Sequence, residues 1–191
     1  MRNCRVTAIA ALLLLGACGG EKTERDPSTP SGYVVPRYLV LKYDEVNARS
    51  GPSEEHRKVG TYKALGMPVQ VIAETKDWRR ICDPLGEVAW VAARMLDGRR
   101  AVLRTQAGAI PIRRSPKPDA DSVASLPERG RAELVKCEGD WCRVRARAGE
   151  GWVRKDEVWG AAEGQQCEGL PAPAPQPRRR RRDAGSRRDF A

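Results

Sequence analysis

The amino-acid sequence predicts an all-β protein built from two small barrels in tandem. The first observation behind this prediction is an internal repeat, in which one pattern recurs about 63 residues along the chain. The second is that the apolar runs are short, rich in valine and isoleucine, and interrupted by glycine, proline, aspartate or asparagine. The third is that no segment after the N-terminal leader has apolar residues at helical spacing, so strands account for the repeated region.

The repeat consists of four pairs of matched segments. They are 46–52 with 110–116, 69–72 with 132–135, 77–81 with 140–144, and 87–91 with 150–153. The offset changes by about one residue from one pair to the next, which is what variation in loop length produces. We therefore predict one barrel over residues 33–100 and a second over residues 101–160.

Each predicted barrel has five short strands. In the first copy they lie near 35–41, 46–49, 68–74, 78–83 and 88–91, and in the second near 101–104, 110–113, 131–137, 141–146 and 151–154. Closing such strands into a barrel removes exposed sheet edges. A unit of about 60 residues is marginally stable on its own, and the link around 97–100 is short. We therefore expect the two barrels to dock against each other.

A hairpin at the centre of each copy predicts which side chains form the core. If 76–77 and 139–140 are two-residue turns, apolar side chains face each other on one side of each hairpin. The facing apolar pairs are Ile72 with Ile81 and Val135 with Val144, and the pairs nearer the turns are Glu74 with Arg79 and Cys137 with Cys142. One copy is therefore expected to have an ion pair where the other has a disulfide.

The N-terminus has the features of a secretory signal peptide. Two arginines precede the apolar run 6–15, which is too short to span a bilayer. The segment that follows, Leu15-Gly16-Ala17-Cys18, closely resembles a bacterial lipoprotein box. We therefore predict a signal peptide over residues 1–17 and a lipid-modified Cys18 that anchors the protein to a membrane. Ordinary cleavage with an unmodified Cys18, leaving a soluble periplasmic protein, is the alternative.

The segments outside the predicted barrels are polar or biased in composition. Residues 18–32 are polar and rich in turn-forming residues, so we expect a tether between the membrane and the first barrel. The residue after Cys18 is Gly19, and in the Gram-negative sorting pattern that this segment resembles, the lack of an aspartate there implies the periplasmic side of the outer membrane. Residues 161–191 contain a proline-rich stretch followed by arginines and are expected to be a disordered tail.

A run of arginines in this tail supplies much of the net charge of +10. The run consists of Arg178, Arg179, Arg180, Arg181 and Arg182. In a reducing cytoplasm it would suggest a nucleic-acid partner, but the predicted export argues against nucleic acid. Contact with anionic lipid headgroups is one expectation, worth about 1 kcal/mol per basic residue near a charged surface. A solubilising end without a partner is the other.

Export also places the cysteines in an oxidising compartment, where disulfides are the default expectation. The facing positions of Cys137 and Cys142 lie within disulfide reach, at about 4.5–5.5 Å between Cα atoms. Pairing of Cys82 with Cys167 follows by elimination and would fasten the segment after the second barrel to the first barrel. A zinc site formed by the four thiols is the alternative, which their spacing and compartment disfavour. No other metal and no cofactor is expected.

Several of these segments resemble bacterial SH3-like domains, also called SH3b domains. They are Val46-Asn47-Ala48-Arg49-Ser50-Gly51-Pro52, the Asp-Trp pairs at 77–78 and 140–141, and the ending Gly151-Trp152-Val153. The span 33–160 resembles tandem exported proteins of this type, in which segments like 137–144 and 158–160 are also typical. The resemblance implies a small barrel fold without specifying a ligand. The sequence departs from the pattern at Ala89, where glycine is usual, and at 112–113, where Asn-Ala-Arg is usual.

Catalysis is not expected. The single histidine, His56, lies in a polar segment and is interpreted as a solvated loop residue. A cysteine–histidine nucleophile would need a reduced thiol within hydrogen-bond reach, and every cysteine of the exported chain has another explanation. The sequence contains no glycine-rich phosphate loop and no histidine-based metal motif.

Tryptophan and arginine side chains form the candidate binding site. The hairpin pairing places four of them on the face opposite the core, namely Trp78, Arg80, Trp141 and Arg143. An aromatic ring beside a cation suits stacking on a sugar or peptide while the cation holds a carboxylate. Packing at the barrel rim is the alternative for Trp78 and Trp141. Trp90 and Trp152, in the closing strand of each copy, are expected to pack across the barrel.

Peptidoglycan offers both sugar rings and carboxylates, and the resemblance to cell-wall-targeting SH3b domains adds to that expectation by analogy of fold. The sequence therefore predicts a non-catalytic cell-envelope protein that binds peptidoglycan or an envelope protein. The alternative is a periplasmic adaptor that binds only another protein and has no affinity for the cell wall. An enzyme is the third hypothesis.

Overall fold

The computed structural model describes residues 25–164, 166 and 167. Its strands are β1 (Arg37–Leu41), β2 (Val46–Arg49), β3 (Lys58–Tyr62), β4 (Pro68–Glu74), β5 (Trp78–Cys82), β6 (Val88–Ala92), β7 (Leu96–Asp97), β8 (Ala101–Leu103), β9 (Ile110–Arg113), β10 (Ser122–Leu126), β11 (Arg131–Glu138), β12 (Trp141–Ala146) and β13 (Gly149–Arg154). Two short 3-10 helices, η1 (Ala93–Met95) and η2 (Lys155–Glu157), follow the last long strand of each copy. None of the helices in this described part is long and apolar enough to cross a bilayer.

Several predictions concern residues outside this range. The signal peptide 1–17, the lipid-modified Cys18 and the arginines 178–182 all lie outside the described residues. The same is true of residues 18–24 of the predicted tether and of 168–191 of the predicted tail. These remain predictions from the sequence.

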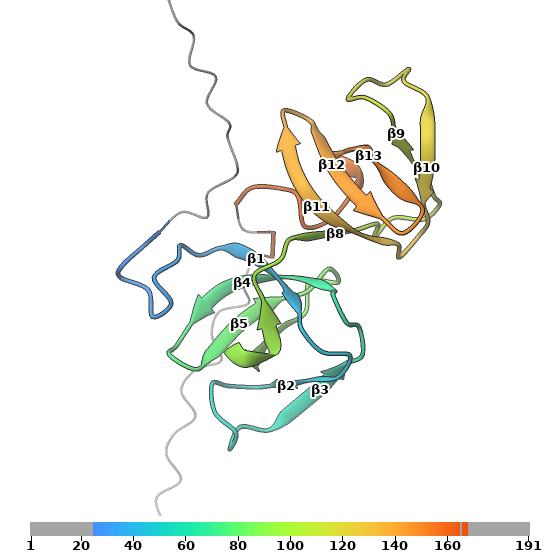
Figure 1. Ribbon diagram of the computed structural model, residues 1–191. Helices are drawn as coiled ribbons and strands as arrows, with labels where there is room; N and C mark the ends of the chain where they lie inside the picture. Colours follow the sequence, from blue (N-terminus) through green and yellow to red (C-terminus); the bar gives the residue numbers. More distant parts are fainter. Residues whose placement is uncertain (1–24, 165, 168–191) are drawn as a thin grey trace, which may run out of the picture.

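The strands form two sheets, one for each copy of the repeat (Figure 1). The first sheet has the strand order β3-β2-β6-β5-β4-β1-β7, and the second has the order β10-β9-β13-β12-β11-β8. The predicted all-β fold with two tandem barrels is therefore confirmed. Within the described residues, the expected closure by hydrogen bonds is incomplete, because β3 and β10 are edge strands that bond on one side only.

The edge strands β3 and β10 are the long strands that the sequence analysis does not predict. Val59 in β3 has 44% of its surface exposed, and Val123 in β10 has 38%. Because many side chains of these strands face solvent, their sequences lack the regular apolar pattern that reveals the other strands. Their existence follows from pairing with β2 and β9, which is a tertiary contact.

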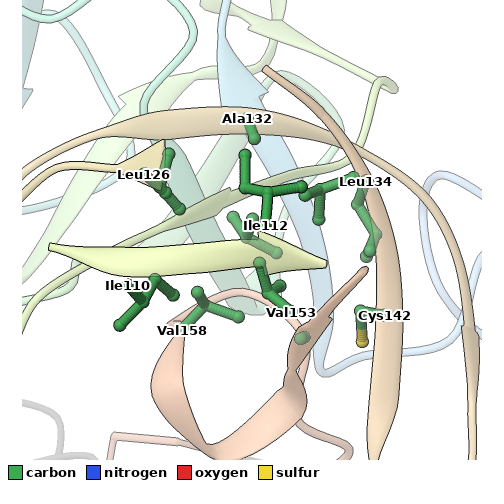
Figure 2. Packing of buried hydrophobic residues seen from close by; sticks show 11 residues of the cluster. Ile110, Ile112, Leu126, Ala132, Leu134, Cys142, Val153 and Val158 are labelled. Atoms are coloured by element: carbon green, nitrogen blue, oxygen red, sulfur yellow. The ribbon is translucent and has the colours of Figure 1, made fainter. Parts of the chain in front are cut away.

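Each barrel has its own hydrophobic core. The first core contains Leu41, Val46, Val69, Val71, Ile81 and Val91, and the second contains Val102, Ile110, Ile112, Leu126, Ala132, Leu134, Cys142, Val144, Val153, Val158 and Ala161. Figure 2 shows how the side chains of the second core, from several strands, point toward one another. Burial of one large aliphatic side chain contributes about 1.5–3 kcal/mol, so these clusters hold each barrel together.

Two predicted pairs close to the central turns are confirmed, but with different chemistry in the two copies. The facing pairs are Glu74 with Arg79 and Cys137 with Cys142. In the second copy the two cysteines form a disulfide, with their Cα atoms 4.0 Å apart. In the first copy Arg79 Nε lies 3.2 Å from Glu74 Oε2. The ion pair and the disulfide therefore occupy equivalent positions.

Glu74 is the centre of a buried polar cluster at this end of the first barrel. Its side chain is only 2% exposed, and Arg37 Nη2 donates a hydrogen bond to Glu74 Oε2 at 2.6 Å. The backbone N–H and the hydroxyl of Ser31 donate to Glu74 Oε1 at 2.9 and 2.6 Å. Burial raises the pKa of this carboxyl, but the hydrogen bonds from Ser31 and Arg37 outweigh burial and leave the pKa below its usual value.

Farther from the turns, the predicted register is wrong by one residue in both copies. The core pairs are Val71 with Ile81 and Leu134 with Val144, in place of Ile72 with Ile81 and Val135 with Val144. The cause is a β-bulge, which inserts one extra residue into β4 and into β11. The bulge leaves Val135 with 42% of its surface exposed, whereas Leu134 is buried.

The two barrels dock directly, as the short link between them predicts. The ring of Trp159 packs edge-on against the ring of Tyr38, with ring centroids 5.1 Å apart. Arg100, in the link, places its Cζ atom 5.4 Å from the Tyr38 ring and donates a hydrogen bond to Gly160 O at 3.2 Å. Burial raises the pKa of Tyr38 to about 12, and the positive charge of Arg100 opposes the rise.

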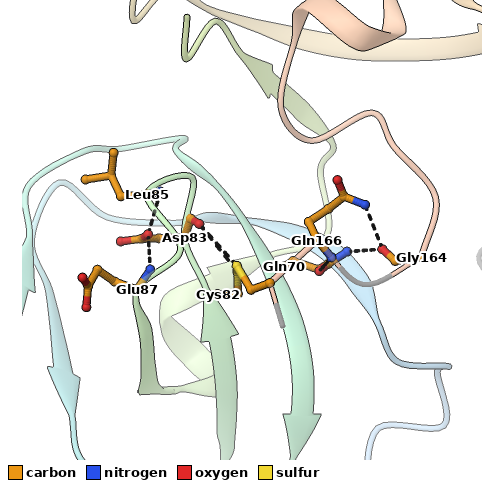
Figure 3. Close-up of a disulfide and its surroundings, with 8 residues drawn as sticks. Gln70, Cys82, Asp83, Leu85, Glu87, Gly164 and Gln166 are labelled. Carbon is orange, nitrogen blue, oxygen red and sulfur yellow. Dashed lines mark hydrogen bonds between the residues drawn. A yellow bond between two sulfur atoms is a disulfide. The ribbon is translucent and has the colours of Figure 1, made fainter. Parts of the chain in front are cut away.

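The segment that follows the second barrel returns to the first barrel (Figure 3). Cys167 pairs with Cys82, with Cα atoms 6.1 Å apart, so the structure brings both expected cysteine pairs together. The side-chain amide of Gln70 donates to Gly164 O at 2.7 Å and accepts from the Gln166 backbone N–H at 2.8 Å. Gln70 is 1% exposed. The returning segment therefore covers part of the β4–β5 face.

This return corrects the predicted boundary of the tail. Residues 161–191 are expected from the sequence to be disordered, yet Ala161 belongs to the second core and Cys167 is 7% exposed. The proline-rich composition that predicts disorder begins only after the last described residue. The first residues of the predicted tail are therefore part of the folded structure.

The second copy has glycine at position 151, whereas the first copy has alanine at the equivalent position, and the surroundings of the two residues explain the difference. A Cβ atom at Gly151 would collide with the backbone oxygen of Arg113 in β9. The first copy has Ala89 at this position, which is 7% exposed and lies opposite Ile81. The departure at Ala89 therefore leaves the fold intact, whereas the second barrel requires glycine for the close approach of β13 to β9.

Candidate ligand-binding face

The outer face of the second barrel alternates tryptophan and arginine on two neighbouring strands. Trp141 of β12 lies opposite Arg154 of β13, and Arg143 of β12 lies opposite Trp152 of β13. The residues between them on the two strands, Cys142 and Val153, are buried in the core. Because side chains alternate between the two faces of a strand, the tryptophans and arginines share the outer face. We call these four residues the second-barrel square.

The aromatic rings of this square have cations beside them. Arg154 places its Cζ atom 5.9 Å from the ring centroid of Trp141. Lys136, on the neighbouring strand β11, places its Nζ atom 5.6 Å from the ring centroid of Trp152. Both tryptophans are half-buried, so each ring packs on one side and retains exposed surface. Such rings combine an apolar face with a positive charge at the edge of the site.

The arginines of the square are ion-paired but accessible. Arg143 Nε lies 2.8 Å from Glu150 Oε1, and Arg154 Nε lies 3.0 Å from Asp156 Oδ1. The two arginine side chains are 45% and 42% exposed. The hydrogen bond from Arg154 lowers the pKa of the Asp156 carboxyl, so this carboxyl stays ionised at neutral pH. The face therefore carries positive and negative charges close together and does not act as a simple cationic patch.

The equivalent positions in the first barrel differ. There Trp78 lies opposite Ala92, and Arg80 lies opposite Trp90. Trp78 is only 9% exposed and Ala92 is 5% exposed. The first barrel therefore lacks one arginine of the square, and the ring of Trp78 has little surface left for a ligand. This finding corrects the expectation that Trp78 is a ligand platform, and it favours packing for this residue.

Trp90 and Trp152 are not core residues, in contrast to their predicted packing across the barrel. Their neighbours Val91 and Val153 point into the cores, so the tryptophan side chains project from the opposite face. The alternation of buried valine and tryptophan along the closing strand is the signal that could have placed Trp152 in the site. Arg154 is missed for the same reason, since it lies two residues beyond Trp152 on that strand.

In each barrel, an arginine from a third strand lies beside the tryptophan of the closing strand. Arg113 of β9 lies opposite Trp152, and Arg49 of β2 lies opposite Trp90. Each also donates a hydrogen bond to the loop that follows it, from Arg113 Nη1 to Ala120 O at 2.8 Å and from Arg49 Nη1 to His56 O at 2.9 Å. The arginine of the repeated 46–52 motif therefore supports this loop.

The other candidate groups form no reactive constellation in the described part of the chain. The ring nitrogen Nδ1 of His56 lies 2.7 Å from Ser53 Oγ in an exposed loop. The four cysteines that the structure describes are paired in the two disulfides. Among the same residues, there is no group of three or more histidine, cysteine, aspartate or glutamate side chains placed to hold a metal ion.

Comparison with known families places both copies of the repeat in one family. The model of the bacterial SH3 domain matches residues 42–98 and 106–160, which together make up more than half of the chain. Comparison with curated proteins gives no significant match.

Two solved structures from Trichomonas vaginalis are similar to the chain. NlpC1 is 14% identical over 66% of this chain and 46% of its own, with a TM-score of 0.30. NlpC2 is 14% identical over 72% of this chain and 52% of its own, with a TM-score of 0.31. The chain therefore spans about half the length of these proteins.

Proposed function

The chain belongs to the bacterial SH3 domain family, and we propose that it is a non-catalytic protein of the cell envelope that binds peptidoglycan. The observation that carries the proposal is the outer face of a barrel on which tryptophan and arginine alternate, as they do in the second-barrel square. An exposed aromatic face is suited to stack on a sugar ring, and a neighbouring guanidinium is suited to hold a carboxylate. Peptidoglycan carries both groups.

The charge balance of this face supports a wall polymer over a nucleic acid. A nucleic-acid site is dominated by unpaired cations that neutralise phosphates. Here Arg143 and Arg154 are held by Glu150 and Asp156. Such a face would repel a uniformly negative polymer at the carboxylates, whereas sugars and peptides with scattered charges can fit between them. Binding without catalysis is in keeping with the pairing of the described cysteines and the loop position of His56.

We also propose that the protein is exported and anchored through a lipid on Cys18, with the arginines 178–182 contacting anionic headgroups. This part of the proposal depends on the lipoprotein-type leader in the sequence. Mass spectrometry of the N-terminal peptide from the producing cell provides the test. We expect a chain that begins at Cys18 and carries acyl groups, and an unmodified peptide would overturn the lipid anchor.

Binding to purified cell walls tests the main proposal. The purified protein is expected to sediment with peptidoglycan sacculi at moderate salt. The Trp152→Ala variant should lose at least about tenfold in affinity, because truncating a central aromatic anchor costs about 2 kcal/mol or more. Its circular dichroism spectrum should match that of the wild type as a folding control. Failure of the wild-type protein to sediment would instead favour an adaptor that binds only another protein.

A further inference from the structure

We propose that only the second barrel binds the ligand, that the first barrel is a structural base, and that the ligand is a glycan strand with carboxylates between its sugar rings. This inference rests on the proposed function, since it names the barrel and the part of the polymer that the site recognises. It depends on the differences between the two copies, on the course of the two chain ends, and on the arrangement of the second-barrel square.

The first barrel uses its outer face for contacts within the protein. Tyr38, Gln70 and Cys82 lie side by side on strands β1, β4 and β5. The ring of Trp159 packs on Tyr38, Gln70 bonds to the returning segment, and Cys82 forms a disulfide with Cys167. Figure 3 shows this segment lying against the first barrel. A ligand cannot reach these positions while the segment is in place.

The counterparts of Gln70 and Cys82 in the second barrel are Glu133 and Arg145, which face each other on β11 and β12. Glu150 of β13 lies beside Arg145, whereas the counterpart of Tyr38 is Ala101, which is 8% exposed. Arg145 Nη1 lies 3.3 Å from Glu133 Oε2, and Arg145 Nε lies 2.9 Å from Glu150 Oε2. The side chains of Glu133 and Arg145 are more than half exposed. Because Glu133, Arg145 and the two arginines of the square are about half exposed, a ligand can reach this part of the second barrel.

The N-terminal segment is also fastened to the first barrel. Ser31 bonds to the buried carboxylate of Glu74 in β4, and the ring of Tyr33 has Arg25 and Arg37 beside it at 4.1 and 5.6 Å. The two ends of the described chain therefore both lie on the first barrel, and the second barrel extends away from them (Figure 1). The first barrel therefore holds both ends of the described chain, and we assign ligand binding to the second barrel.

The arrangement of the square indicates the ligand. Its two tryptophans lie on one diagonal and its two arginines on the other, and diagonal neighbours in an antiparallel pair are about 7–8 Å apart. Sugar rings, whose C–H faces can stack on tryptophan, would match this pattern if they alternate with carboxylates. A guanidinium has five N–H donors, so the contacts of Arg143 and Arg154 with Glu150 and Asp156 leave donors for a ligand carboxylate. Glycan strands freed of their peptides present a carboxylate on alternate sugars, whereas the stem peptides contain no sugar rings.

Matched variants in the two barrels test which one binds. Trp152→Ala and Arg154→Gln alter the second-barrel square, and Trp90→Ala is the equivalent change in the first barrel. Binding to glycan strands from which the peptides have been cleaved should fall at least about tenfold for both second-barrel variants and stay within about twofold of wild type for Trp90→Ala. Arg154→Gln removes an exposed charge without opening the core, so its loss of binding cannot be attributed to misfolding. Loss of binding in Trp90→Ala with retention in Trp152→Ala would overturn the assignment to the second barrel.

Soluble fragments test the class of ligand, with calorimetry as the readout. The probes are glycan strands from which the peptides have been cleaved, chitin oligosaccharides as a neutral control, and free stem peptides. We expect the glycan strands to bind at least about tenfold more tightly than the chitin oligosaccharides, a difference of about 1.4 kcal/mol. Equal binding of the neutral sugar, or binding of the peptides alone, would overturn the glycan assignment. A wild-type protein that binds none of the probes and no sacculi would overturn the proposed function itself.

Discussion

Replacing Glu74 by alanine is expected to lower the free energy of unfolding by about 3–5 kcal/mol. The carboxylate is 2% exposed and receives hydrogen bonds from Ser31 and Arg37, with Arg79 at 3.2 Å. Its removal leaves two guanidinium groups, 10% and 11% exposed, without their buried counter-charge. Breaking a buried ion pair from one side is strongly destabilising for this reason. Urea unfolding followed by tryptophan fluorescence measures the loss.

A surface carboxylate in the second barrel provides the control for this variant. Glu138 pairs with Lys136 at 2.6 Å, but the two side chains are 56% and 41% exposed. Because exposed ion pairs contribute little, Glu138→Ala is expected to change stability by no more than about 1 kcal/mol. If Glu74→Ala cost no more than Glu138→Ala, the buried cluster would not hold the segment before β1 to the first barrel.

The same residue makes stability depend on pH. The pKa of Glu74 is lower in the folded protein than the ordinary value of 4.5. The ionised carboxyl therefore stabilises the fold fully above that ordinary value, and this contribution is lost as the pH falls through the lower pKa of the folded state. In Glu74→Gln this acid-induced loss should be smaller than in the wild type. Comparing the two proteins in acid titrations isolates the contribution of Glu74 from those of the other carboxyls.

Removing the disulfide between Cys82 and Cys167 is the change with the next largest expected effect. The two cysteines are 85 residues apart in sequence, and a cross-link that closes a long loop removes much of the entropy of the unfolded chain. The Cys82→Ala/Cys167→Ala variant should lose about 4.5 kcal/mol. Hydrogen exchange should also become faster at the Gln166 amide, which donates to Gln70. Urea unfolding and exchange measurements on the same sample check the two effects.

The other disulfide gives the matched control. Cys137 and Cys142 are only 5 residues apart, so the same relation predicts a loss of about 2 kcal/mol for the Cys137→Ala/Cys142→Ala variant. The long-range disulfide should therefore contribute about twice as much as the short one. Equal losses in the two double variants would mean that the returning segment is held on the first barrel mainly by its other contacts.

Local features of the sequence were sufficient to predict the hairpins near their turns. The two-residue turns at 76–77 and 139–140 set the register of the adjacent residues, and Glu74–Arg79 and Cys137–Cys142 pair accordingly. The prediction becomes wrong where the bulges in β4 and β11 insert a residue. A bulge depends on how the strand bends around its core and on both of its neighbours, so the hairpin sequence alone does not reveal it.

The sequence alone was enough to identify a duplicated all-β protein, because repeats, turn residues and strand composition are local properties. The sequence did not show that Tyr38, Gln70 and Cys82 on the outer face of the first barrel are covered, whereas Glu133 and Arg145 of the second barrel are exposed. The reason is that exposure depends on contacts between distant segments, such as Gln70 with Gly164 and Cys82 with Cys167. Two copies with nearly the same pattern can therefore present different surfaces.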